Sequence, residues 1–174
     1  TVTLDGQQFV SGDRSRHLYN VHFCRDCGQE YIPVWDQDGA EGRTFAVRNI
    51  EERAYEDDAV KAGFLMPDVS GIWDEGNLEN YPETWIEERP DGEWRVKPTQ
   101  KKYLPQAVKV RSDGITTTAG GLSVWFIPGS FRFCLSCGVT HTTSGSVAVR
   151  VLPPDREYVA TVLVRTGGTE LRAE

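Results

Sequence analysis

Apolar side chains recur at alternate positions over many short stretches of this chain, which is the pattern of β-strands with one buried face. The stretches end at Gly, Pro or Asp-Gly turns, as strands in antiparallel sheets commonly do. We expect strands at residues 2–10, 16–23, 29–35, 43–50, 94–98, 106–111, 115–119, 122–127, 146–152 and 158–165. The pattern therefore predicts a mainly β fold.

One short helix is expected in this β pattern, at residues 81–89. Pro82 suits the first turn and Glu83 suits the helix N-terminus, and Pro-Asp-Gly at 90–92 ends the segment. Residues 51–79 are acidic and interrupted by Gly and Pro, so we interpret them as a loop. Four apolar residues are expected to tether that loop to the body of the protein: Phe64, Leu65, Met66 and Trp73.

The chain has 174 residues, the size of one ordinary domain, and we take 1–174 as a single domain. Hydrophobic content is 39%, but five Trp, six Tyr and seven Phe supply large side chains for a core. No apolar run approaches the roughly 20 residues of a membrane span. No segment resembles a signal peptide, so a cytoplasmic location without membrane contact is expected.

Charge is distributed unevenly along the chain. The net charge of −7 argues by itself against nucleic acid binding. Residues 51–93, however, carry fourteen acids and three bases, whereas the remaining residues carry twelve acids and sixteen bases. We therefore interpret 51–93 as an acidic insertion in a mildly basic domain.

Two short motifs of the form Phe-Cys-x-x-Cys-Gly hold all four cysteines, at residues 23–28 and 133–138. Two residues between thiols allow one tight turn to aim both sulfurs at a single point, and the Gly supplies the positive φ that such a turn needs. The sulfurs are those of Cys24, Cys27, Cys134 and Cys137. Four thiolates form the closed tetrahedral site of structural zinc, so we expect one Zn²⁺ per chain and a zinc-ribbon-like core of two knuckles.

Other uses of these thiols remain open from the residues alone. A rubredoxin-like iron site has the same four thiolate ligands. Disulfides would require an oxidising compartment. A thioredoxin-like redox pair would lie at the start of a helix, but no helical pattern follows either motif. His22 and His141 lie near the motifs and could enter a metal shell, but four thiolates already complete it.

Residues 95–111 form the densest basic run, which contains no acid. Its bases are Arg95, Lys97, Lys101, Lys102, Lys109 and Arg111, with Tyr103 among them and Trp94 at the edge. Cations interleaved with aromatic rings can follow a phosphate backbone and stack on bases. The alternatives are a solvated edge strand, which lysines protect from aggregation, or a surface that pairs with the acidic insertion.

Four stretches together are similar to a segment of large bacterial superfamily 2 DEAD/DEAH-box helicases. They read His-Leu-Tyr-x-Val-x-Phe-Cys-Arg-Asp-Cys-Gly-Gln-Glu-Tyr at 17–31, Gly-Phe-Leu-Met-Pro at 63–67, Tyr-Pro-Glu-x-Trp at 81–85 and Trp-Phe-Ile-Pro-Gly-x-Phe-Arg-Phe-Cys-x-x-Cys-Gly at 125–138. The resemblance covers roughly residues 1–141. In those proteins this cysteine-bearing block is an accessory region associated with the helicase core.

The resemblance implies a parent polypeptide that moves along nucleic acid at the expense of ATP. A phosphate-binding loop and the other common catalytic motifs are not found in this sequence. We therefore expect a zinc-binding module that is not itself an enzyme and that supports nucleic acid engagement or domain positioning. Its partners would be the parent's helicase core and DNA or RNA, with no small-molecule substrate. The alternatives are a protein–protein interaction domain that uses the acidic insertion, or an iron-tetrathiolate redox protein.

Overall fold

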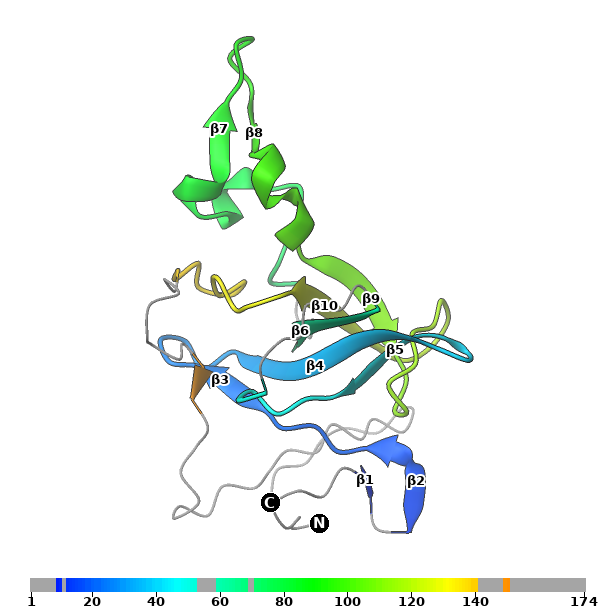
Figure 1. Ribbon diagram of the computed structural model, residues 1–174. Coiled ribbons are helices and arrows are strands. Elements are labelled where there is room, and N and C mark those ends of the chain that lie inside the picture. The colour runs from blue at the N-terminus through cyan, green and yellow to red at the C-terminus, as the bar shows by residue number, and fades with distance from the viewer. Residues whose placement is uncertain (1–8, 11, 53–58, 69–70, 141–148, 151–174) are drawn as a thin grey trace.

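The computed structural model of this chain describes residues 9–10, 12–52, 59–68, 71–140 and 149–150 (Figure 1). In this part the regular structure is eleven strands and three short 3-10 helices. The strands are β1 (Phe9–Val10), β2 (Asp13–His17), β3 (His22–Cys24), β4 (Glu30–Gly39), β5 (Gly42–Val47), β6 (Val60–Pro67), β7 (Ile86–Glu88), β8 (Trp94–Val96), β9 (Gln106–Val110), β10 (Leu122–Pro128) and β11 (Val149–Arg150). The 3-10 helices are η1 (Leu78–Asn80), η2 (Glu83–Trp85) and η3 (Pro98–Tyr103). The prediction of a mainly β fold is confirmed.

The main sheet is built around β4. Its seven strands follow the order β11, β3, β4, β6, β10, β9, and β5 also pairs with β4. β4 is ten residues long and pairs antiparallel with β3 at residues 30–31, with β6 at 32–37 and with β5 at 34–39. One long strand therefore connects the first cysteine motif, which follows β3, to the rest of the sheet.

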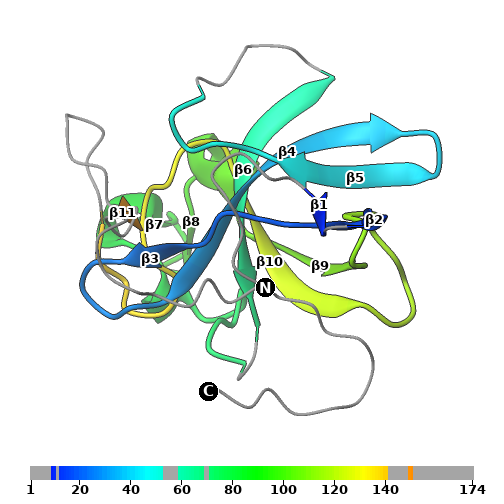
Figure 2. The same cartoon turned by 90° about the horizontal axis from the view of Figure 1, so that it is seen from below.

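Residues 114–117 close this sheet into a barrel. The backbone N–H of Phe45 in β5 donates to the carbonyl oxygen of Gly114 at 2.8 Å, and the N–H of Thr116 donates back to β5 at 2.9 Å. On its other side the same segment exchanges backbone hydrogen bonds of 2.9 Å with the end of β9. Figure 2 shows β4 and β5 on one side of the resulting interior and β9 and β10 on the other.

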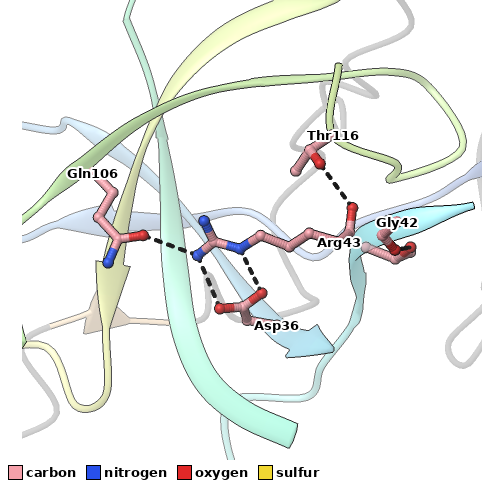
Figure 3. A network of polar contacts seen from close by, with 6 residues as sticks. Asp36, Gly42, Arg43, Gln106 and Thr116 are labelled. Carbon is pink, nitrogen blue, oxygen red and sulfur yellow. Dashed lines mark hydrogen bonds and ion pairs between the residues drawn. The ribbon is translucent and has the colours of Figure 1, made fainter. Parts of the chain in front are cut away.

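A network around Arg43 reinforces the closure (Figure 3). The Arg43 guanidinium donates to both carboxylate oxygens of Asp36 in β4, at 2.8 and 2.9 Å, and to the Gln106 side chain in β9 at 3.0 Å. The hydroxyl of Thr116 donates to the Arg43 carbonyl oxygen at 3.0 Å. The Arg43 guanidinium also lies 4.9 Å from the ring centroid of Phe126. Arg43 of β5 therefore contacts β4, β9 and β10 through its side chain and the closing segment through its backbone carbonyl.

Two cores lie on opposite faces of the shared strands β6 and β10, because successive side chains of a strand point to opposite sides. The barrel core lies inside the barrel and consists of Ile32, Val34, Phe45, Leu65, Val110, Val124 and Phe126. The knuckle core lies on the outer face and consists of Cys24, Tyr31, Phe64, Met66, Trp73, Tyr81, Trp85, Trp125, Ile127, Phe133, Cys134 and Leu135. Both faces of the sheet are thus buried.

The expected loop over residues 51–79 is wrong at β6, which is a central strand between β4 and β10. A strand buried on both faces carries a continuous apolar run rather than an alternating one. Because acidic residues flank this run on both sides, the whole segment was interpreted as an acidic loop. Gly63 also appeared to interrupt the run. A Cβ at Gly63 would lie 2.8 Å from the Ile127 carbonyl oxygen and would overlap the Phe126 ring, so glycine is required where β10 packs closely.

The expected helix at residues 81–89 is also wrong. The structure has one 3-10 turn, η2, whose Trp85 N–H donates to the Pro82 carbonyl oxygen at 2.8 Å, and then the strand β7. β7 pairs with β8 in a separate two-stranded sheet, which projects from the body in Figure 1. Local helix signals in so short a segment are weak, and pairing with β8 overrides them. Trp94 of this hairpin is 55% exposed.

The predictions near the ends of the chain are tested only in part. The strand expected at 16–23 is interrupted, because β2 ends at His17 and β3 begins at His22. The strand expected at 146–152 is represented by β11, which pairs with β3. The strand at 158–165 lies outside the described residues, as does 2–8 of the first predicted strand, and the extent of the domain stays a prediction.

Candidate metal centre

The four cysteine side chains point toward one another and form one cluster of sulfur atoms. Their Sγ atoms all lie within 4.8 Å of one another. The Sγ atoms of Cys24 and Cys137 are 3.9 Å apart, and those of Cys27 and Cys134 are 3.6 Å apart. A tetrahedron with Zn–S bonds of about 2.3 Å has S···S edges of about 3.8 Å. The sulfurs are therefore spaced for one metal ion at their centre.

The two turns that present the sulfurs have the same backbone geometry. In the first, the Cys24 N–H donates to the Gln29 carbonyl oxygen at 2.8 Å, and the Gly28 N–H donates to the Cys24 carbonyl oxygen at 2.9 Å. The second repeats both bonds from Cys134 to Val139 and from Gly138 to Cys134, at 3.0 and 2.9 Å. The first cysteine of each turn is buried and the second is exposed.

A glycine in the left-handed region permits each turn. Gly28 has φ of 77° and Gly138 has φ of 73°. A side chain at this φ is strained, although nothing lies within 4 Å of either position that would block a Cβ. The Cys-x-x-Cys-Gly motif therefore predicted the local geometry of both turns.

Different elements hold the two turns. The first turn connects β3 and β4, where His22 pairs with Tyr31. The second follows β10 and is closed by an isolated bridge between Phe133 and Thr140. A metal at the sulfurs would therefore connect the β3–β4 hairpin to a segment that no strand of the main sheet contains.

Tyr31 joins the two turns without a metal. Its hydroxyl accepts a hydrogen bond from the Leu135 N–H at 2.9 Å and donates to the Cys134 sulfur at 3.2 Å. Tyr31 is fully buried. Burial, and next the hydrogen bond to Cys134, raise the pKa of this phenol far above its ordinary value, so the hydroxyl stays protonated and available as a donor. Sequence analysis assigned Tyr31 no role at the cysteine cluster and missed this contact.

Burial disfavours the charged, thiolate form, and at two of the four cysteines the pKa is raised overall. Burial raises the pKa of Cys134 and of Cys137 above the ordinary value for a thiol. Burial acts in the same direction on Cys27, but the Gln29 N–H and bonds from neighbouring thiols lower the pKa of Cys27 overall. Deprotonation of all the thiols in this partly buried place is therefore costly unless a metal ion lies among them.

His22, the described histidine near the motifs, is not part of the cysteine cluster. His22 is only 3% exposed, and it does not belong to the group of side chains that could hold the metal. Burial, and next the nearby Arg48 cation, lower the pKa of His22 to about 4, so its ring is neutral at neutral pH. His141 lies outside the described residues.

Aromatic rings pack around the second turn. The ring centroid of Phe133 lies 5.6 Å from that of Trp73 and 5.0 Å from that of Trp85. Phe131 lies 4.7 Å from Tyr31 by the same measure. Among these aromatic residues, sequence analysis singled out only Trp73, as a tether between the acidic segment and the body. That prediction is confirmed, because Trp73 is buried against Phe133.

The six bases of the 95–111 run lie on several elements. Arg95 is on β8, Lys97 precedes η3, Lys101 and Lys102 are in η3, Lys109 is on β9, and Arg111 follows β9. They therefore do not form one edge strand. Their role in nucleic acid binding stays a prediction.

No protein family, curated protein or solved structure matches this chain. The fold and the cysteine cluster thus define the class: a mainly β protein with four cysteines positioned to coordinate one metal ion. None of the helices in the described ranges has the length and apolar character that a membrane span needs.

Proposed function

We propose that this chain is a structural zinc-binding module in which Cys24, Cys27, Cys134 and Cys137 hold one Zn²⁺. The observation that carries the proposal is the convergence of four sulfurs within 4.8 Å, from two motifs separated by 106 residues. Four protein thiolates leave no coordination position for a substrate, which is typical of structural rather than catalytic zinc. The ion fastens the second turn to the β3–β4 hairpin and so closes the knuckle core.

Metal analysis of natively purified protein tests the identity of the ion. We expect about one zinc per chain, because four thiolates complete one tetrahedral site. An iron site would use the same ligands, but it would absorb visible light, whereas zinc is colourless. Bound iron with visible absorbance would replace the zinc proposal with the redox alternative, and protein without metal would contradict both.

We further propose that the module belongs to a large bacterial DEAD/DEAH-box helicase, where it supports nucleic acid engagement or positions domains. The support for this context is the sequence resemblance over roughly residues 1–141. The motor would then lie elsewhere on the parent polypeptide, and this module would have no catalytic role. The purified chain should hydrolyse no ATP above background. Turnover that is lost in a point mutant of this chain would overturn that part of the proposal.

A further inference from the structure

The predicted basic residues differ in whether they already have partners. Arg95 forms an ion pair with Glu87 at 2.8 Å, and Arg111 forms one with Asp113. The Lys97 amine donates to the Thr84 carbonyl oxygen at 2.7 Å. The other three, Lys101, Lys102 and Lys109, are exposed and pair with no carboxylate among the described residues. Their charges are therefore available to a ligand.

Arg132 is a further cation, and it lies close to Lys102 at the ring of Tyr103. The Arg132 guanidinium lies 3.7 Å from the ring centroid of Tyr103, and the Lys102 amine lies 4.9 Å from the same centroid. Arg132 pairs with no carboxylate in the part of the chain that the structure describes, and its Nε is buried without a hydrogen-bond partner. Two positive charges thus meet at one aromatic ring, and no acid among the described residues compensates them.

The electrostatics at Tyr103 are consistent with this distribution of charge. The hydrogen bond to Lys102 is the largest influence on the phenol and lowers its pKa, and the charges of Arg132 and Lys102 act in the same direction. No carboxylate of the described residues is among these influences. The ring therefore marks an electropositive spot, although the net charge of the whole chain is negative.

The cysteine turn holds Arg132 in place. Its neighbours Phe131 and Phe133 both pack into the knuckle core, and the metal ligand Cys134 follows two residues later. Tyr103 ends η3 and packs near Gly129, just after β10. In Figure 1, η3 lies next to the end of β10, where the segment carrying Arg132 begins. The site is therefore assembled from two segments, one of which the metal fixes.

We propose that Lys102, Tyr103 and Arg132 form a phosphate-binding site for single-stranded nucleic acid, which rests on and refines the proposed function. Arg and Lys side chains bind phosphate oxygens through charge-assisted hydrogen bonds. An aromatic ring among cations also suits base stacking, as in single-strand-binding proteins. Lys101 on η3 and Lys109 on β9 add further positive charges, unpaired among the described residues, which suit a polyanion better than one isolated phosphoryl group.

The test compares Arg132→Gln and Lys102→Gln with Arg95→Gln, which removes the same charge from an ion-paired residue. Binding of fluorescent oligo-dT and oligo-U is measured by anisotropy at about 30 mM salt, where screening is weak. Loss of one phosphate contact should weaken binding about tenfold there and lower the salt slope by about 0.7. Arg95→Gln should retain the wild-type salt slope. Equal losses in all three variants would overturn the site, because the effect would then depend on total charge alone.

Two further measurements test the aromatic ring and the class of ligand. Tyr103→Leu keeps both cations and should still weaken oligonucleotide binding, since the base-stacking ring is lost. Equal binding of a phosphoserine peptide and an oligonucleotide by the wild type would overturn the nucleic acid assignment in favour of a phosphoprotein partner. Circular dichroism and zinc content confirm that each variant is folded.

Failure of this proposal is distinguishable from failure of the proposed function. If the wild type contains one zinc but binds no oligonucleotide at about 30 mM salt, the phosphate site is wrong and the structural zinc stands. If the protein contains no zinc, the proposed function is wrong whatever the binding result. Chelation of the zinc should abolish the difference between wild type and Arg132→Gln, because Arg132 then loses its fixed position.

Discussion

The barrel core and the knuckle core share the strands β6 and β10 but are closed by different means. Hydrogen-bonded backbone surrounds the barrel core, because residues 114–117 join β5 to β9. The knuckle core is covered instead by 3-10 turns, loops and the two cysteine turns. Loops provide few backbone bonds between distant segments. Where the strands end, the two cysteine turns meet at their four sulfurs and at the Tyr31 hydroxyl.

The largest expected effect comes from removing the metal, which should separate the two cores. In Cys134→Ser the apparent binding free energy of structural zinc, on the order of 10 kcal/mol in small peptides, is lost. We expect near-ultraviolet circular dichroism from Trp73 and Trp85 to collapse, while the far-ultraviolet signal of the barrel largely remains. Ser130→Ala, at an exposed position nearby, is the control. An unchanged melting curve in metal-free protein would contradict this prediction.

The next largest effect is expected at Gly63, in a strand that both cores share. In Gly63→Ala the new methyl group meets the Phe126 ring and the Ile127 carbonyl oxygen. Overpacking of this kind costs about 1–3 kcal/mol, and chemical denaturation should show the loss for the whole protein in one transition. Gly76→Ala is the matched control, since a Cβ there would meet only the Asp74 side-chain oxygen, at 3.3 Å. Two separate transitions would show that the shared strands do not couple the cores.

Tyr31→Phe should weaken only the knuckle core. The change leaves the buried Leu135 N–H without an acceptor, which costs about 1–3 kcal/mol. It also removes a hydrogen bond to a metal ligand, and loss of such a bond typically lowers metal affinity by about 10- to 100-fold. Competition with a chromophoric chelator measures the affinity. Tyr81→Phe is the control, because that hydroxyl lies in the same core but donates to the Glu75 carbonyl oxygen at 3.0 Å. Equal affinities for the two variants would exclude a role for Tyr31 at the metal.

The smallest effect is expected on the barrel side, from Asp36→Asn. The Arg43–Asp36 pair is partly exposed, with side-chain exposures of 31% and 14%, so its loss should cost about 1 kcal/mol or less. Thermal denaturation should detect a small drop in melting temperature, and zinc affinity should not change. A measurable loss of zinc would show that the barrel and the metal centre are coupled through β4.

Sequence reasoning succeeded best where chemistry is local. Spacing within each cysteine motif predicted both turns and their glycines, and four thiols in two pairs predicted one shared cluster. The strands at β4, β5, β9 and β10 followed from short apolar runs. These features depend on residues close together in the chain, so a single sequence is sufficient to recognise them.

The remaining features depend on contacts between distant residues. β6 was interpreted as a loop because its apolar run lies between acidic residues and contains Gly63. A glycine is needed at this position because β10 packs closely against it, and the sequence alone does not show that contact. Residues 115–119 were predicted as a strand, but the structure has only isolated bridges there, and nothing in their sequence reveals that residues 114–117 join β9 to β5 and close the barrel. No sequence motif indicates that Tyr31 contacts Cys134, or that Arg132 contacts Tyr103. Such pairings become visible only in three dimensions.

The long separation between the two cysteine motifs also affects how the protein is made. The first turn leaves the ribosome before the second, and 106 residues must still be synthesised between Cys27 and Cys134. At roughly 5–20 residues per second this interval lasts about 5–20 s. During that time Cys24 and Cys27 are a two-thiolate site without its complement, accessible to oxidants and to loosely held metal. If the four sulfurs bind metal as proposed, maturation of this protein therefore depends on a reducing environment during translation, well before the native fold can protect the sulfurs.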